Sequence, residues 1–210
     1  MNLLSFLFPL AVAAVSIGLP PSDKVSMSEA FTLHIELADK RIDLPRPVQN
    51  TFVSVMHVGA GLNVLTSLPD KNGAKTFYVN ATVNDDPTTY RTFTDCGNPP
   101  TPFGINLIPD ELEKYVRTAY LRPSRGYNGT YINGYTAELT PANWLACDEP
   151  VEYYGGRHFN VLKQVYYEPY PTPRECVAVK LFAECAKLNK LPKDAESNHD
   201  FVKAVTCFRK

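Results

Sequence analysis

The 210-residue sequence lacks the charge imbalance, the sequence repeats and the long apolar segments that mark several large classes of protein. Its 21 lysines and arginines nearly balance 22 aspartates and glutamates, and a net charge of -1 does not favour binding to nucleic acid. No run of 18 apolar residues follows residue 18, as a transmembrane helix would require. The hydrophobic fraction of 44% is too high for a disordered chain. We therefore expect one folded domain that does not bind nucleic acid.

Motifs of common enzymes and of cofactor or metal sites are also missing. There is no G-x-S-x-G nucleophile elbow and no H-E-x-x-H zinc motif, and the cysteines have neither CxxC spacing nor nearby histidines. Gly59-Ala60-Gly61 lacks the third glycine of a dinucleotide-binding loop, so a turn is the better interpretation. The sequence predicts no cofactor and no metal, and it favours a non-enzymatic function while leaving an enzyme open.

The first 18 residues are typical of a secretory signal peptide. They contain no charged side chain, and an apolar run over residues 3–15 gives way to small residues. We expect cleavage after Ser16 or Gly18, followed by a flexible lead-in over residues 19–27 that is rich in proline and serine. The mature chain is then expected to be secreted, extracellular and free of any membrane segment.

Two N-glycosylation sequons agree with export. They begin at Asn80 and Asn128, and the strand pattern around Asn80 points that side chain outward. Lys40-Arg41 is either a cleavage site for a kexin-type protease or an ordinary pair of exposed bases. The sequence therefore predicts a glycoprotein and leaves this further processing open.

Alternation of apolar and polar residues dominates the chain from residue 28 to residue 185 and predicts β-strands. Asn133-Gly134 adds a strong hairpin signal. Strands are expected at 31–37, 51–58, 76–83, 88–94, 115–122, 130–133, 135–139, 159–167 and 176–183. Short strands without interleaved helices predict an all-β domain, either an antiparallel β-sandwich or a barrel.

The lysine-rich tail at residues 186–210 departs from this alternation. Ser197 and Asp200 have the spacing of a capping box at the start of a helix. An apolar stripe would follow on one helix face, formed by Phe201, Val202, Val205 and Phe208. We expect a short C-terminal helical appendage docked on the β domain.

Five cysteines lie outside the leader, so an oxidising compartment allows two disulfides and one free thiol. We expect Cys147 to bond Cys176, because the intervening segment contains one strand and two Pro/Tyr-rich bends that return the chain to its start. A second bond from Cys185 to Cys207 would fasten the tail. Cys96 is then free, or replaces Cys185 as the partner of the tail.

An aromatic cluster beside several prolines is the most suggestive candidate site. Exposed aromatic rings can stack on sugars, whereas packing in the core or at its rim is the alternative for these residue types. His57, at the end of a strand, is a further candidate ligand or base, or an ordinary histidine at the rim. The cluster consists of Trp144, Tyr153, Tyr154, Tyr166, Tyr167 and Tyr170.

Acidic side chains are numerous enough to supply a glycosidase-like pair. Such a pair needs two carboxyl groups roughly 5–10 Å apart, one of them with a raised pKa. Solvated loop charges are the alternative interpretation of these residues. The candidates are Asp85, Asp86, Asp95, Asp110, Glu111, Glu113 and Asp148.

Five short motifs stand in an order that resembles a known family. They are residues 56–63 (MHVGAGLN), 77–82 (FYVNAT), 143–148 (NWLACD), 165–167 (VYY) and 175–181 (ECVAVKL). Over about residues 29–183 the sequence resembles small secreted proteins of filamentous fungi that are classed as a domain of unknown function. The resemblance implies secretion and a β fold, and it implies no reaction.

These features together predict a secreted, non-enzymatic fungal protein that acts at or outside the cell wall, by binding either wall polysaccharide or a host component. A secreted hydrolase that uses a carboxylate pair is the second hypothesis, and it requires two acidic side chains that converge in one cleft. An effector-type interaction protein without a small ligand is the third, and it would lack an exposed aromatic patch.

Overall fold

The computed structural model describes residues 24–81 and 86–209. The expected signal peptide and most of the expected lead-in lie outside the described residues, but the end of that lead-in belongs to the first strand. The strands are β1 (Val25–Ser28), β2 (Ala30–Leu37), β3 (Thr51–Gly59), β4 (Leu62–Leu68), β5 (Tyr78–Asn80), β6 (Arg91–Cys96), β7 (Thr101–Pro109), β8 (Val116–Arg122), β9 (Trp144–Val151), β10 (Arg157–Val165), β11 (Cys176–Ala186), β12 (Val202–Lys203) and β13 (Val205–Phe208).

The thirteen strands belong to one mixed sheet, which confirms the all-β class. Its order is β1-β13-β11-β2-β3-β4-β10-β8-β7-β6-β5-β12, and β9 pairs with both β10 and β11. The pairing of β11 with β13 is parallel, so the sheet is not purely antiparallel. Three short 3₁₀ turns lie between the strands: η2 (Lys71–Gly73), η3 (Pro87–Thr89) and η4 (Glu152–Tyr154). No helix in the described ranges has the length and apolar character to cross a bilayer.

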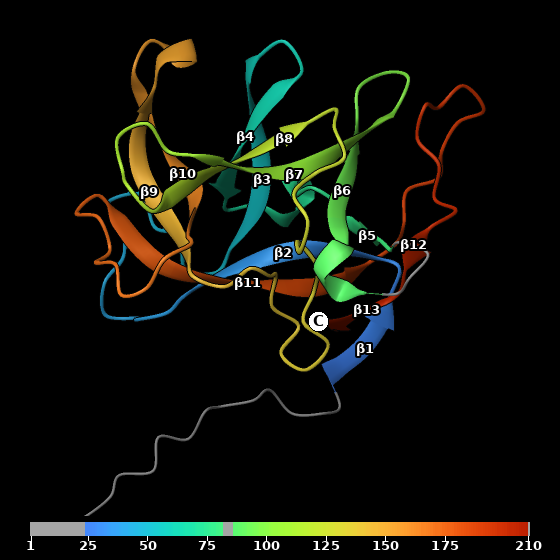
Figure 1. Cartoon of the computed structure of the whole chain (residues 1–210), viewed down its shortest axis with the longest axis horizontal. Coiled ribbons are helices and arrows are strands. Elements are labelled where there is room, and N and C mark those ends of the chain that lie inside the picture. Colours follow the sequence, from blue (N-terminus) through green and yellow to red (C-terminus); the bar gives the residue numbers. More distant parts are fainter. Residues whose placement is uncertain (1–23, 82–85, 210) are drawn as a thin grey trace, which may run out of the picture.

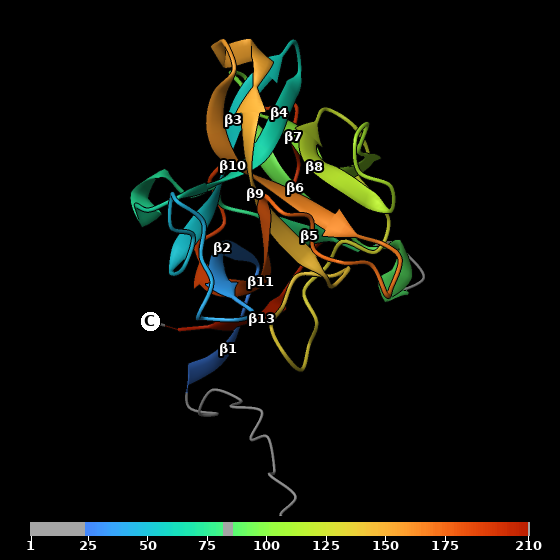
Figure 2. The same cartoon turned by 90° about the vertical axis from the view of Figure 1, so that its left-hand side faces the viewer.

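The sheet curves around one main core. The long strands β3, β4, β9 and β10 rise to one end of the molecule, whereas β2, β11, β13 and β1 form the opposite end (Figures 1 and 2). Strand β2 is buried along almost its whole length, rather than on one face as its alternation suggests. It lies between β11 and β3, and Phe31 also bridges to Phe77, so both edges of this strand are paired. One of its faces packs into the main core cluster through Phe31, Leu33, Ile35 and Leu37.

The C-terminal helical appendage predicted from the sequence is wrong. Residues of its proposed apolar stripe belong to the strands β12 and β13, which pair with β5 and with β1 and β11. Val205 and Cys207 are buried and alternate with more exposed neighbours, whereas Phe201 is exposed. A segment this short gains more from adding to existing strand edges than from one or two turns of isolated helix.

The predicted hairpin around Asn133-Gly134 is also wrong, because residues 130–139 contain isolated bridges and no named strand. The Asn133 side chain accepts hydrogen bonds from the backbone amides of Tyr135 and Thr136, which closes a wider loop than a two-residue hairpin turn. The Gly59-Ala60-Gly61 turn, by contrast, joins β3 to β4 as expected, with Gly61 at φ 63°.

Both predicted disulfides are present, Cys147–Cys176 and Cys185–Cys207, and Cys96 is a free thiol. Cys147 and Cys176 face each other in the register of β9 and β11, with Cα atoms 4.0 Å apart. The second disulfide joins β11 to β13, so it fastens a strand rather than a helix.

Candidate functional site

A cleft of about 740 Å³ lies among the turn between β7 and β8, strand β9 and strand β10. Its apolar lining comes from Leu62 and Val64 of β4 and Val161 of β10, among others. Carboxylates outnumber the bases Lys163, Arg174 and His158 along its walls. The acidic lining residues are Asp110, Glu111, Glu113, Asp148, Glu149, Glu152 and Glu175.

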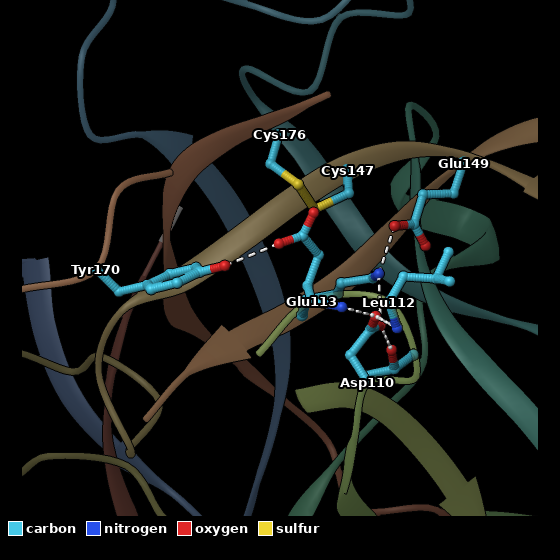
Figure 3. Close-up of polar contacts among 9 residues, drawn as sticks. Asp110, Leu112, Glu113, Cys147, Glu149, Tyr170 and Cys176 are labelled. Carbon is cyan, nitrogen blue, oxygen red and sulfur yellow. Dashed lines mark hydrogen bonds and ion pairs between the residues drawn. A yellow bond between two sulfur atoms is a disulfide. The ribbon is translucent and has the colours of Figure 1, made fainter. Parts of the chain in front are cut away.

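A buried lysine joins two of these carboxylates inside the cleft. Lys163 of β10 is only 3% exposed, and its Nζ lies 2.6 Å from Asp110 Oδ2. The same ammonium also pairs with the Glu149 carboxylate (Figure 3). Because an unpaired charge at this depth is strongly unfavourable, Lys163 requires these two partners, and the three side chains form one ionic cluster.

Asp110 accepts hydrogen bonds at both carboxylate oxygens. Its Oδ1 accepts from the backbone amides of Leu112 and Glu113, each at 3.0 Å, and its Oδ2 also accepts from the Thr118 hydroxyl at 2.8 Å. Burial opposes ionisation of Asp110, but these donors and Lys163 outweigh it and lower its pKa. The side chain is therefore a fixed anion that orders the turn between β7 and β8.

Burial shifts the pKa of Glu149 in the other direction. Desolvation raises it, Lys163 opposes that shift, and the charges of Asp110 and Glu113 reinforce it. Burial also disfavours the charged form of Lys163, but its two carboxylate partners outweigh this effect and raise its pKa. Two neighbouring carboxyl groups thus differ in pKa, which is the pattern that acid–base pairs of enzymes use.

A group of tyrosines, here called the tyrosine surface, adjoins the cleft. Tyr115 stands at its centre, with ring centroids 6.0 Å from Tyr166, 4.6 Å from Tyr167 and 5.7 Å from Tyr170. Tyr166 and Tyr167 are 45% and 52% exposed. The Tyr170 hydroxyl donates to Glu113 Oε2 at 2.8 Å, so this tyrosine connects the surface to the cleft (Figure 3).

A second hollow of about 490 Å³, here called the Arg117 pocket, is lined in part by Tyr166. The Arg117 guanidinium lies 4.1 Å from the Tyr166 ring centroid and 5.2 Å from that of Tyr127. Its Nη1 donates to the Tyr127 hydroxyl at 2.8 Å. Two aromatic rings and one hydrogen bond therefore hold the guanidinium in place beside an exposed aromatic surface.

Comparison with known proteins identifies the family. A family model described as a domain of unknown function, DUF7907, matches residues 28–185. The chain belongs to this DUF7907 family. It is also 33% identical, over 95% of its length and 93% of the relative, to the antigenic protein SchS34 of Stachybotrys chartarum. No solved structure matches it.

The predicted resemblance is thus confirmed at the level of an uncharacterised domain family.

The predicted aromatic cluster does not form one group in this DUF7907 member. Trp144 is 2% exposed, and its Nε1 donates to the Leu139 carbonyl, so it is a core residue and not part of a binding surface. The interpretation of Trp144 as an exposed ring is wrong because its side chain packs in the main core cluster.

The other predicted aromatic residues form two separate groups. Tyr166, Tyr167 and Tyr170 contribute to the tyrosine surface. Tyr153 and Tyr154 lie in η4, and the Tyr153 ring packs edge-on against His57, with centroids 5.2 Å apart. His57 is therefore part of an aromatic rim at the tip of β3.

The two sequon asparagines have different environments in the DUF7907 fold. Asn128 is exposed, and its Oδ1 accepts from Arg91 Nε at 2.6 Å. Asn80 lies between β6 and β12, and its side-chain oxygen is buried without a hydrogen-bond partner in the described part of the chain. Asn80 is half-buried, so its side chain is less exposed than the strand pattern predicts.

Sequence reasoning missed Lys163, Glu149, Arg117, Tyr115 and Tyr127. A signal existed for Lys163, which occupies an apolar face between Val161 and Val165 on a predicted strand. Interpreting Asp110 as a solvated loop charge was wrong, because its side chain is 8% exposed. No group of three or more His, Cys, Asp or Glu suited to a metal ion occurs within residues 24–81 and 86–209.

Proposed function

We propose that this protein is a secreted, non-enzymatic fungal protein that binds glycan at or outside the cell wall through its tyrosine surface. The observation that carries the proposal is the group of four tyrosines in ring contact, two of which are about half exposed. Exposed aromatic faces are suited to stack on sugar rings, and their hydroxyls find polar partners at a wet surface. An effector-type protein without a small ligand has no need of such a patch.

Three further observations support an extracellular location. Two disulfides are typical of proteins that mature in an oxidising compartment. Residues 1–18 have the pattern of a signal peptide, which places the mature start near Ile17 or Leu19. A relative from Stachybotrys chartarum is named an antigenic protein, which agrees with exposure outside the cell.

Replacing Tyr166 and Tyr167 together by alanine should weaken retention on the polymer that the wild type binds by about tenfold. The measurement is a pull-down of mature protein from culture medium on insoluble chitin and β-glucan, followed by a binding isotherm. Tyr135→Ala is the matched control, because Tyr135 is 96% exposed and lies in the loop over residues 133–138. Absence of wild-type retention on either polymer would remove the glycan-binding proposal.

A secreted hydrolase remains a second candidate because Asp110 and Glu149 converge on Lys163 in one cleft with pKa shifts of opposite sign. In this candidate Glu149 is the general acid and Asp110 the stabilising anion. Glu149→Gln should then reduce the release of reducing ends from wall oligosaccharides at least about 100-fold. Glu111→Gln, in the same cleft, is the control. A wild-type protein that releases no reducing ends rejects this candidate.

A further inference from the structure

The Arg117 pocket contains a cation that has no anionic partner among residues 24–81 and 86–209. The guanidinium donates to a neutral phenol, and no carboxylate of the described residues forms an ion pair with it. The ammonium groups of Lys163 and Lys71 differ in this respect, because each pairs directly with a carboxylate. A half-buried guanidinium held by two rings therefore keeps most of its N–H donors available.

The amide groups of the pocket lining are suited to the polar, uncharged part of a small ligand. Asn128 and Asn143 supply amide groups, and Gln164 is 3% exposed with a side-chain oxygen that lacks a partner within the described ranges. A buried acceptor without a donor is costly, and a hydroxyl is the simplest group that would satisfy it. The volume of about 490 Å³ lies in the usual range for small-molecule sites.

We infer that the Arg117 pocket binds a sugar that carries a carboxylate, that is, a uronic acid unit of an acidic glycan. This inference rests on the proposed glycan binding and names its chemical class. A carboxylate matches the fork of N–H donors on a guanidinium, and a single arginine neutralises a single negative charge. Arg117 is the sole lysine or arginine among the lining residues, and Glu168 at the rim disfavours more highly charged groups. Neighbouring sugars of the chain would extend across Tyr166, which lines the pocket and belongs to the tyrosine surface.

The test is a titration of the full mature chain with trigalacturonate and triglucuronate, and with neutral trisaccharides of the same length. N-glycans are removed first, because Asn128 lines the pocket and a glycan attached there begins at its rim. The wild type should bind at least one acidic trisaccharide about tenfold more tightly than its neutral counterpart, and more weakly as salt increases. If only one of the two acidic trisaccharides binds, the result identifies whether the pocket selects galacturonate or glucuronate.

Arg117→Gln should remove the preference for the acidic trisaccharide, and Arg117→Lys should restore only part of it. Arg122→Gln is the matched control, because Arg122 lies at the exposed end of the same strand and does not line the pocket. Circular dichroism and thermal unfolding establish that each variant is folded. Equal binding of acidic and neutral sugars, or equal losses in the Arg117 and Arg122 variants, would overturn the inference while leaving glycan binding through the tyrosines intact. Failure of every sugar to bind would reject both.

Discussion

Replacing Cys147 and Cys176 together by alanine is expected to lower the free energy of unfolding by roughly 3.6 kcal/mol. The bond closes a loop with a sequence separation of 29 residues, and loop-closure entropy in the unfolded chain sets this magnitude. For a domain of this size the midpoint of thermal unfolding should fall by about 7–14 °C. Chemical and thermal denaturation of the variant and the wild type measure both quantities.

The position of this disulfide explains why the effect should be large. Strand β10 lies inside the loop and pairs with β9, while the two cysteines directly join β9 to β11. Cys147 is completely buried, so the bond also stabilises a contact in the second, smaller core cluster with Val116, Leu145 and Val165. Without the bond the unfolded chain is less restricted, and the denaturant dependence of unfolding should increase.

Cys96→Ala provides the control for losing a thiol. Cys96 is free and only partly buried, so this substitution should change the free energy of unfolding by less than about 1 kcal/mol. If the free energy of unfolding of the double alanine variant also changes by less than about 1 kcal/mol, strand pairing alone is sufficient to bring residues 147 and 176 together. The proposed contribution of loop closure would then be wrong.

The disulfide could be predicted from the sequence because the information is local to one segment. Cys147 ends an apolar run, Cys176 begins an alternating one, and two Pro/Tyr-rich bends between them shorten the path. The same reasoning failed for the tail, where Ser197 and Asp200 have capping-box spacing although Val205 and Cys207 lie in a strand. Pairing with distant β1 and β11 decides the conformation there, and no local pattern contains that information.

The candidate sites were predictable only in part, for the same reason. Tyr166, Tyr167 and Tyr170 are close in sequence, so their grouping was visible, but Tyr115 comes from a different part of the sheet. Lys163 interrupts an apolar strand face, which indicates a buried ion pair. Its partner Asp110, however, lies 53 residues away in the sequence. Strand order decides which acid meets that lysine, and strand order was not accessible from periodicity.

Lys163→Met should reduce the free energy of unfolding by about 3–5 kcal/mol at about pH 7, because it leaves the buried Asp110 carboxylate and the half-buried Glu149 carboxylate without their cation. Chemical denaturation measures the change. Lys180→Met is the matched control, since Lys180 forms a more exposed pair with Glu138 at 2.9 Å and should lose less than about 1 kcal/mol. Similar losses in the two variants would contradict a special role for burial.

The dependence on pH separates this explanation from simple loss of packing. In the wild type the pKa of Asp110 is lower in the folded than in the unfolded chain. Asp110 therefore stabilises the fold at pH values above its pKa in the unfolded chain, and this contribution is lost as the pH falls through its pKa in the folded state. The raised pKa of Glu149 has the opposite sign, because its contribution is present at low pH and is lost as the pH rises. The two effects therefore partly cancel, and the wild-type cluster adds only a weak slope in acid.

Without Lys163 the folded-state pKa of both carboxyl groups should rise, because burial and their mutual repulsion lose the opposing positive charge, while the hydrogen bonds to Asp110 from Thr118, Leu112 and Glu113 remain. Protonation removes the cost of the uncompensated negative charges. The difference in free energy of unfolding between Lys163→Met and the wild type should therefore shrink as the pH is lowered from about 7 to about 4.5. The triple variant Lys163→Met with Asp110→Asn and Glu149→Gln has no charges to titrate at this position, and its deficit should not vary over the same range. A deficit of Lys163→Met that stays constant with pH would show that lost packing, and not two uncompensated carboxylates, causes the destabilisation.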